Sequence, residues 1–271
     1  MPDRPAIFEE SVSRNGSWRA DFNGWQIFVV ESVEPAHRGL QREHEIADEV
    51  GAGARRPTIF IWRSERALIV ARGQTSWSNF EKVAVELAGM GWPVLVRRSG
   101  GGAFPICRGT VQIAMMGTCA DLGVSMDGVY DRLGFLIGSA LTDFGIAAYL
   151  GDTLRAFCDG RHDLVVAGRK IAGLAQHWRL CSGGERCVTA AASVLVEADV
   201  GELVGIVDRF HAACGQKIDI RPEAMTTVSC HAVGLSHRNL TAEFSAYLAA
   251  AAARTRLALP FERPSRDGIE V

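Results

Sequence analysis

The stretch VLVRRSGGGAFP at residues 94–105 places a run of three glycines directly after a short β-rich segment. Three successive glycines remove every Cβ from one side of a turn, so several backbone N–H groups can converge on one anion. Arg97 and Arg98 precede the glycines and supply positive charge. The stretch therefore predicts a phosphate- or carboxylate-binding turn, with a plain solvent-exposed turn as the alternative. The spacing is neither that of a Walker A loop nor that of a dinucleotide-binding fingerprint.

A second informative stretch is DGRHDLVVAGRKIAGLA at residues 159–175. Two short apolar runs flank the turn at residues 167–168, which predicts a hairpin with Lys170 at the start of its returning strand. Side chains alternate in direction along a strand, so Lys170 faces opposite to Arg169 and Ile171 and can point inward. Lysine occurs only at positions 82, 170 and 217 among 29 basic residues, which favours a specific use of a compact ammonium at Lys170. The alternative is an exposed lysine beside a hairpin turn.

The pattern around these stretches predicts an α+β fold. Apolar residues at helical spacing predict helices, and short β-rich runs between turn residues predict strands. Without an internal repeat or a low-complexity linker, one domain on a mixed sheet is the simplest architecture. We expect an N-terminal extension (residues 1–25), one domain (26–258) and a C-terminal tail (259–271). The predicted helices are 38–50, 80–88, 126–150, one opened by a capping box at 199–202, and 241–257; the predicted strands are 58–62 and 67–71 (as a hairpin or two neighbouring strands), 94–97, 111–116, 164–166, 170–175 and 188–197.

The composition excludes several classes of protein. The chain has 271 residues, of which 22% are charged and 48% hydrophobic, and a formal net charge of -2. This balance gives no footprint for nucleic acid, and no uncharged apolar run is long enough to cross a membrane. The N-terminus lacks the order of a secretory signal, so we expect a cytoplasmic protein, with a monomer as the default. The 7 cysteines contain no Cys-x-x-Cys pair, so neither a disulfide framework nor a zinc site is expected.

Four motifs, taken together and in order, resemble those of the lipoate-protein ligase A family, part of the wider biotin/lipoate ligase and octanoyltransferase group. The resemblance extends over residues 38–230. Residues 69–74 look like the family's strand that ends in a Gly-Arg-x-Gln type segment, and residues 97–103 look like its Arg-x-Ser-Gly-Gly-Gly-Ala signature. Residues 160–164 resemble its Gly-Arg-Asn-Asp-Leu run, and residues 168–175 resemble the lysine-bearing hairpin that follows.

The resemblance implies a fold and an activity. The fold is a single catalytic domain of class II biotin/lipoyl ligase type, with a mixed, mainly antiparallel β-sheet flanked by α-helices. The activity is ligation of lipoate or octanoate: ATP activates the acid as an acyl-adenylate, and the acyl group passes to a lysine of a lipoyl carrier domain of the 2-oxoacid dehydrogenase E2 or glycine cleavage H protein type. The acyl tail would lie in a narrow apolar tunnel.

The same resemblance assigns roles to individual residues. Lys170 falls on the family's catalytic lysine, whose charge would neutralise the oxygen that becomes negative in each step. Asp163 would also hold Mg²⁺ through the nucleotide. The residues that fall where the family binds nucleotide and acyl-adenylate are Arg97, Ser99, Gly100, Gly101, Gly102, Ala103, Phe104, Pro105 and Asp163.

Two departures from the family pattern leave alternatives open. His162 replaces the asparagine beside Asp163, and residues 107–110 replace an Asp-x-Gly-Asn segment. One alternative is an ATP-independent octanoyl or lipoyl transferase that forms a thioester on Cys158, twelve positions before Lys170. Free cysteines are often buried structural residues, so a structural role for Cys158 competes with the role of nucleophile. Another alternative is a non-catalytic family member that binds lipoyl groups or nucleotide.

Overall fold

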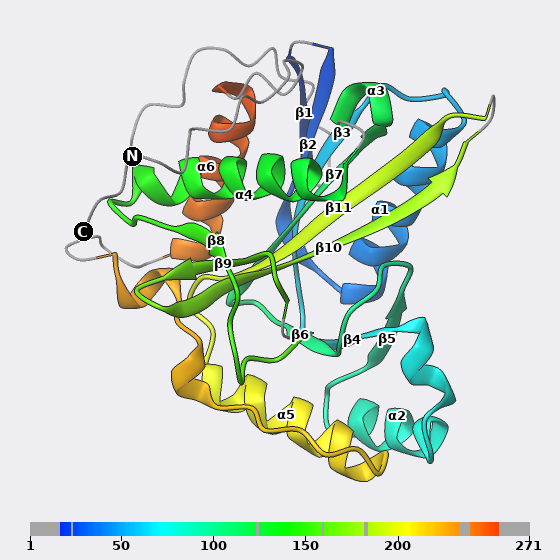
Figure 1. Cartoon of the computed structure of the whole chain (residues 1–271), viewed down its shortest axis with the longest axis vertical. Coiled ribbons are helices and arrows are strands. Elements are labelled where there is room, and N and C mark those ends of the chain that lie inside the picture. The colour runs from blue at the N-terminus through cyan, green and yellow to red at the C-terminus, as the bar shows by residue number, and fades with distance from the viewer. Residues whose placement is uncertain are drawn as a thin grey trace.

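The computed structural model describes residues 17–22, 24–122, 125–158, 160–181, 184–232 and 239–254. Helices and strands are interspersed along this part of the chain (Figure 1). In chain order the elements are β1 (Ser17–Phe22), β2 (Trp25–Glu34), α1 (Ala36–Gly51), β3 (Thr58–Ser64), β4 (Ala67–Ala71), η1 (Arg72–Ser76), α2 (Phe80–Gly89), β5 (Val94–Arg97), β6 (Phe104–Ile106), β7 (Thr110–Thr118), α3 (Cys119–Leu122), α4 (Met126–Asp143), β8 (Tyr149–Gly151), β9 (Asp163–Val166), β10 (Arg169–Leu180), β11 (Arg186–Leu195), α5 (Val200–Ala213), η2 (Pro222–Ala224), η3 (Val228–Cys230) and α6 (Leu240–Arg254).

Two sheets form the centre of the molecule. The larger has the strand order β1-β2-β3-β7-β11-β10-β9-β8, and the smaller has the order β5-β4-β6. In the larger sheet only β2 and β3 pair in parallel, and every other neighbouring pair is antiparallel. The expected α+β fold on a mixed, mainly antiparallel sheet is therefore confirmed.

Alternation along the strands sends side chains to two different cores. Ile59 and Ile61 of β3 pack with α4 and α6 on one face of the large sheet. Phe60 and Trp62 pack with α1 and with Ile69 of the small sheet on the other face. The small sheet thus lies against the large sheet on the α1 side.

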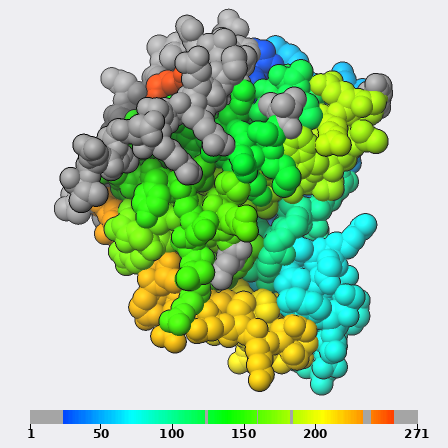
Figure 2. All heavy atoms as spheres, viewed as in Figure 1, coloured from blue at the N-terminus to red at the C-terminus, as the bar shows by residue number. Residues whose placement is uncertain are grey.

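The far face of the small sheet is covered by two helices. Leu68 and Val70 of β4 share a core with α2 and α5. The two helices meet through Phe80 and Phe210, whose ring centroids are 6.2 Å apart. Figure 2 shows the α2 region in cyan and α5 in yellow side by side at the lower end of the molecule. This packing fixes the small sheet, and with it the glycine turn between β5 and β6.

Local sequence explains several element boundaries. The Ser125 hydroxyl accepts a hydrogen bond from Gly128 N and begins α4, and the Asp199 carboxylate accepts one from Glu202 N and begins α5, as the capping box predicts. The predicted helix over residues 126–150 is too long. It ends at Asp143, because Gly145 then adopts φ 72°, and β8 follows.

The predicted pairing of residues 58–62 with 67–71 is wrong. β3 pairs with β2 and β7 in the large sheet, whereas β4 pairs with β5 and β6 in the small sheet. The intervening residues therefore carry the chain from one sheet to the other. Periodicity identifies both strands but gives no information about which sheet each one joins.

The chain joins the large sheet at Ser17, where β1 pairs with β2, so part of the expected extension 1–25 belongs to the fold. Residues 1–16 and the expected tail 259–271 lie outside the described residues. At the end of the β10–β11 hairpin, Cys181 and Cys187 form a disulfide, which the cysteine spacing did not predict. No helix in the described ranges is long and apolar enough to cross a membrane.

Candidate active site

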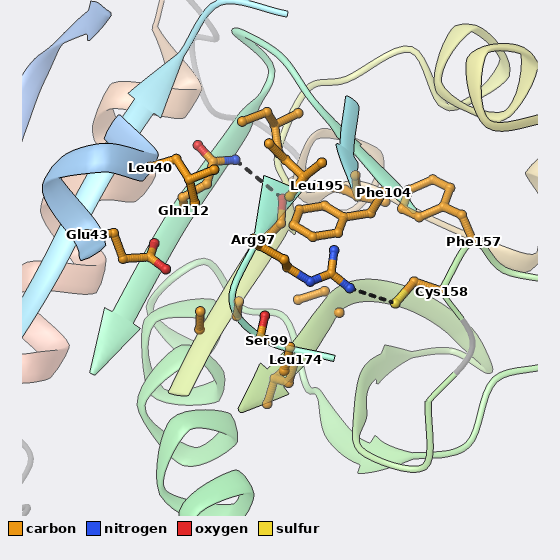
Figure 3. A pocket seen from close by; sticks show the side chains of 18 of the residues that line it. Leu40, Glu43, Arg97, Ser99, Phe104, Gln112, Phe157, Cys158, Leu174 and Leu195 are labelled. Atoms are coloured by element: carbon orange, nitrogen blue, oxygen red, sulfur yellow. Dashed lines mark hydrogen bonds between the residues drawn. The ribbon is translucent and has the colours of Figure 1, made fainter. Parts of the chain in front are cut away.

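An apolar pocket lies between the two sheets. Its floor comes from β7, β10 and β11, and its other walls come from α1, the small sheet and the loop before β9. Figure 3 shows Arg97 in the middle of the pocket, with Cys158 on one side and Glu43 and Gln112 on the other. Apolar side chains form most of the wall, among them Leu40, Ile69, Phe104, Ile106, Leu174 and Leu195.

Lys170 points into this region, as the strand alternation predicts. It is 1% exposed, and its Nζ donates to the carbonyl oxygens of Phe157 (3.0 Å) and Cys158 (2.8 Å). The ammonium also forms an ion pair with Asp163 Oδ1 at 2.9 Å. Three donors thus meet three acceptors, which is the condition for keeping an ammonium buried.

Asp163 completes the arrangement around Lys170. Its second oxygen accepts hydrogen bonds from the Thr153 hydroxyl and from Gly160 N. Burial raises the pKa of the Asp163 carboxyl, while the Lys170 ammonium acts in the opposite sense. Both carboxylate oxygens are therefore already engaged by the protein.

Arg97 is held by the glycine turn that follows it. Its Nε and Nη2 donate to Gly100 O at 3.1 and 2.7 Å, and Nη2 also donates to Gly102 O at 2.8 Å. The guanidinium lies 4.7 Å from the centroid of the Phe104 ring. Burial lowers the pKa of Arg97, and the neighbouring Cys158 opposes this shift. Within the described part of the chain, Arg97 Nη1 is a buried donor without a partner.

The sulfur of Cys158 faces two donors. Gly102 N donates to Cys158 Sγ over 3.0 Å, and Arg97 Nη2 lies 3.8 Å from the same atom. Cys158 has φ 54°, in the left-handed region that non-glycine residues rarely adopt. The glycine turn and the loop before β9 therefore meet at this sulfur.

Most of the sequence-predicted site residues lie in the pocket wall or next to it, and the others lie in the core or inside the small sheet. Arg97, Ser99, Phe104, Cys158 and Lys170 line the pocket. Gly101 and Gly102 contact Cys158, since a Cβ on either would approach its atoms at 2.9 and 3.3 Å respectively. Gly100 O holds Arg97. Ala103 and Pro105 are buried but do not line the pocket: Ala103 packs in the core beneath α2 and α5, and Pro105 pairs with Leu68 inside the small sheet.

The predicted Mg²⁺ role of Asp163 does not fit this arrangement. Its oxygens are occupied by Lys170, Thr153 and Gly160. The described ranges contain no cluster of three or more His, Cys, Asp or Glu side chains placed to hold a metal ion. Asp163 is instead the buried counter-ion of Lys170.

Three polar side chains of the pocket were not predicted from the sequence as site residues: Glu43, Gln112 and Ser193. The pKa of Glu43 is raised to about 7 by burial, with a hydrogen bond from Trp62 and the charge of Arg97 acting in the opposite sense. The sequence contains a signal for Glu43: it follows Leu40 by three positions, which places its carboxyl on the apolar face of α1. Gln112 and Ser193 lie in runs that read simply as strands, and nothing in those runs marks their positions.

A buried lysine, a thiol facing two donors and an apolar pocket between two sheets thus meet at one place in the structure. The family described as the lipoyl protein ligase A/B catalytic domain matches residues 35–249, and the chain belongs to this family. The resemblance inferred from the motifs is thereby confirmed.

Individual relatives agree with this assignment. The chain is 31% identical over 199 residues to the uncharacterized protein H16_B0148 of Cupriavidus necator, covering 68% of this chain and 79% of that one. It is 30% identical over 209 residues to the octanoyl-GcvH:protein N-octanoyltransferase of Kyrpidia tusciae, covering 75% of this chain and 72% of the relative. A crystal structure of lipoate-protein ligase A bound with ATP shares the fold at a TM-score of 0.57 and 17% identity, over 79% of this chain and 81% of that chain.

Proposed function

We propose that this enzyme moves an octanoyl or lipoyl group from one lipoyl carrier to a lysine of another, through a thioester on Cys158. The observation that carries this proposal is the hydrogen bond from Gly102 N to Cys158 Sγ, in the wall of an apolar pocket beside Lys170. The name of the Kyrpidia tusciae relative, an octanoyl-GcvH:protein N-octanoyltransferase, supports a carrier of the glycine cleavage H protein type as donor.

The reaction has two steps that mirror each other. In the first, Cys158 Sγ attacks the carbonyl carbon of the acyl amide on the donor carrier; a C–S bond forms, the C–N bond breaks, and the thiol proton leaves with the donor lysine amine. In the second, the amine of the acceptor lysine attacks the thioester; a C–N bond forms, the C–S bond breaks, and a proton from the amine returns to sulfur. No other reactant is consumed.

Arg97 and Lys170 have different roles in these steps. Arg97 Nη1, the buried donor without a partner in the described structure, is available to the oxygen that becomes negative when the carbonyl is attacked. The three N–H groups of the Lys170 ammonium are directed to Phe157 O, Cys158 O and Asp163. We therefore assign Lys170 to holding the Cys158 segment in place and to adding positive charge behind it.

The ATP-dependent ligase, implied by the resemblance, is the second candidate. The unpaired Arg97 Nη1 and the Ser99 hydroxyl in the pocket wall favour it, since both suit an anionic phosphate. Two contacts weigh against it: Gly102 N is directed to sulfur, and Asp163 is engaged by Lys170. The thioester route uses the hydrogen bond from Gly102 N to sulfur, the free Arg97 donor and the ion pair of Lys170 with Asp163, so we place it first.

The deciding experiment offers the purified enzyme an octanoyl-loaded H-type carrier and an apo E2 lipoyl domain without ATP, and follows all masses by intact-protein spectrometry. We expect octanoyl to appear on the E2 domain and, transiently, on the enzyme. Cys158→Ser should abolish both signals, whereas Cys119→Ser, at another free cysteine, should leave them unchanged. Labelling of the carrier only when ATP and free octanoate are supplied, with Cys158→Ser fully active, would replace the transferase by the ligase.

A further inference from the structure

The floor of the pocket contains polar groups that a plain hydrocarbon chain cannot satisfy. Gln112 is 5% exposed and lines the pocket, and its Oε1 has no hydrogen-bond partner in the described structure. A buried acceptor without a donor is costly, and native proteins rarely keep one. The Gln112 side chain therefore requires an explanation that the transfer chemistry does not give.

In the structure the nitrogen of the Gln112 amide faces Thr110 and Ser193, and Oε1 is the end without a partner. Thr110 Oγ1 accepts from Cys107 N at 3.0 Å and donates its single proton to Cys107 O at 2.9 Å. The remaining contact of Thr110 Oγ1, at 2.8 Å, is with the amide nitrogen of Gln112. Oε1 is consequently the free atom, and it is an acceptor.

Ser193 lies beside Gln112 and provides a donor. Its Oγ accepts from Gln112 Nε2 at 3.3 Å, so its own proton remains for another partner. The two residues are directly paired across β11 and β7 and lie on the same face of the sheet. An acceptor and a donor are thus presented together on the pocket floor.

The position of this pair matches the far end of an eight-carbon chain. Gly173 lies against the Lys170 ammonium, since a Cβ on Gly173 would be 3.3 Å from Nζ. Gly173 pairs with Ser193, and Ser193 pairs with Gln112. Two strand spacings, about 10 Å, therefore separate the backbone of Gly173, beside the lysine, from the backbone of Gln112. An extended acyl chain that starts at the reactive end of the pocket reaches Gln112 with its last carbons.

We propose that Gln112 and Ser193 form a subsite for a hydrogen-bond donor at the distal end of the acyl chain. The substrate class is then an acyl group with a hydroxyl or thiol near its sixth to eighth carbon, such as a hydroxyoctanoyl or a reduced, dithiol lipoyl group, in preference to plain octanoyl. This inference rests on the proposed function for the position of the acyl carbonyl.

The test compares octanoyl, 8-hydroxyoctanoyl and dihydrolipoyl groups, each loaded on the same H-type carrier, in pairwise competition. We expect kcat/KM to favour the two donor-bearing chains by about tenfold, because octanoyl leaves Oε1 unpaired. Preference for the hydroxyl alone, or for the dithiol alone, supports the subsite and identifies its natural donor. Gln112→Leu should remove the preference, and Ser193→Ala should reduce it.

The control is Gln176→Leu, at a buried glutamine outside the pocket whose Nε2 donates to Met126 O; it should leave the ratio unchanged. Calorimetric binding of free octanoate, 8-hydroxyoctanoate and dihydrolipoate separates this inference from the transferase proposal. A preference in binding without any transfer retains the subsite and rejects the transferase. Transfer without a preference supports the transferase and rejects the subsite. Equal kcat/KM values and equal affinities for all three chains overturn the subsite.

Discussion

Gly102 N donates a hydrogen bond to Cys158 Sγ over 3.0 Å, although 56 positions separate the two residues in sequence. The contact exists because the small sheet, which carries the glycine turn, packs against the large sheet, whose strand β9 follows the Cys158 loop. A turn with the composition of a phosphate site therefore presents an N–H group to a thiol. The proposed transfer of an acyl group through sulfur would take place at this contact, and the predictions below address its parts.

The first prediction concerns the glycines of the turn. Gly101 has φ 101°, and a Cβ there would lie 2.8 Å from Arg97 Nη2 and 2.9 Å from Cys158 Sγ. Gly101→Ala should therefore displace both groups and reduce the transfer rate by about 10²-fold, the effect of a misplacement of roughly 1 Å. Initial rates of carrier-to-carrier transfer measure this effect.

Gly100 offers a matched control in the same turn. Nothing lies within 4 Å of a Cβ built there, and its φ is not positive. Gly100→Ala should transfer at close to the wild-type rate. Equal rates for the two alanine variants would show that the approach of Gly101 to the sulfur does not matter for the reaction.

The second prediction concerns the unpaired donor on Arg97. Arg97→Lys keeps the positive charge but lacks the planar fork that holds two carbonyl oxygens and presents Nη1. We expect kcat to fall by about 10²-fold with a smaller change in KM, because the lost contact forms mainly in the transition state. Arg98→Lys, at a neighbouring residue whose guanidinium bonds the exposed Asp48, should leave both constants nearly unchanged. A rise in KM alone for Arg97→Lys would place this donor in ground-state binding.

The third prediction concerns the buried pair of Lys170 and Asp163. Lys170→Met leaves the Asp163 carboxylate buried without its counter-ion and should lower the free energy of unfolding by about 3–5 kcal/mol. Adding Asp163→Asn removes the orphaned charge and should restore part of the loss. Urea denaturation measures all three proteins.

Lys82 is the control for this pair. It is exposed, and its Nζ lies 3.8 Å from Glu86 on the same helix. Lys82→Met should change the unfolding free energy by less than about 1 kcal/mol. If Lys170→Met is no more destabilising than Lys82→Met, the buried charges do not depend on each other.

Much of the fold follows from local patterns. The helix α1 and the strands β4, β5 and β9 lie close to their predicted ranges, because periodicity and turn residues report directly on local structure. The strand β10 begins one residue before its predicted start but continues to Leu180, well beyond the predicted end at residue 175. Lys170 points inward as strand alternation predicts. The pairing of β3 and β4 was not predictable, since membership of a sheet depends on which faces pack together.

The site was predictable in part for the same reason. The composition of the glycine turn predicts an anion site, and the rarity of lysine singles out Lys170. Neither pattern reveals that Gly102 N faces Cys158, that Asp163 is the counter-ion of Lys170, or that Gln112 lies in the pocket floor. These contacts join elements far apart in sequence, and only the packing of the two sheets creates them.

The last prediction concerns Glu43, which the pocket holds with a pKa raised from 4.5 to about 7 by burial. The folded protein keeps this proton between about pH 4.5 and 7, whereas the unfolded chain releases it. Stability from this group is therefore complete below pH 4.5, falls as pH rises through 7 and is level above that. Glu43→Gln cannot ionise, so its stability relative to wild type should increase through this window. Glu45→Gln, on an exposed face of the same helix, is the control.

The same ionisation should affect the substrate. Above pH 7 the Glu43 carboxylate places a negative charge in the wall of a mainly apolar pocket, so the octanoate anion should bind wild type more weakly at pH 8 than at pH 6. Glu43→Gln should bind octanoate nearly equally at both values. Urea denaturation from pH 5 to 8, with calorimetry at pH 6 and 8, measures both effects. If the stability difference between Glu43→Gln and wild type is constant across this range, Glu43 does not titrate near neutrality in the folded protein.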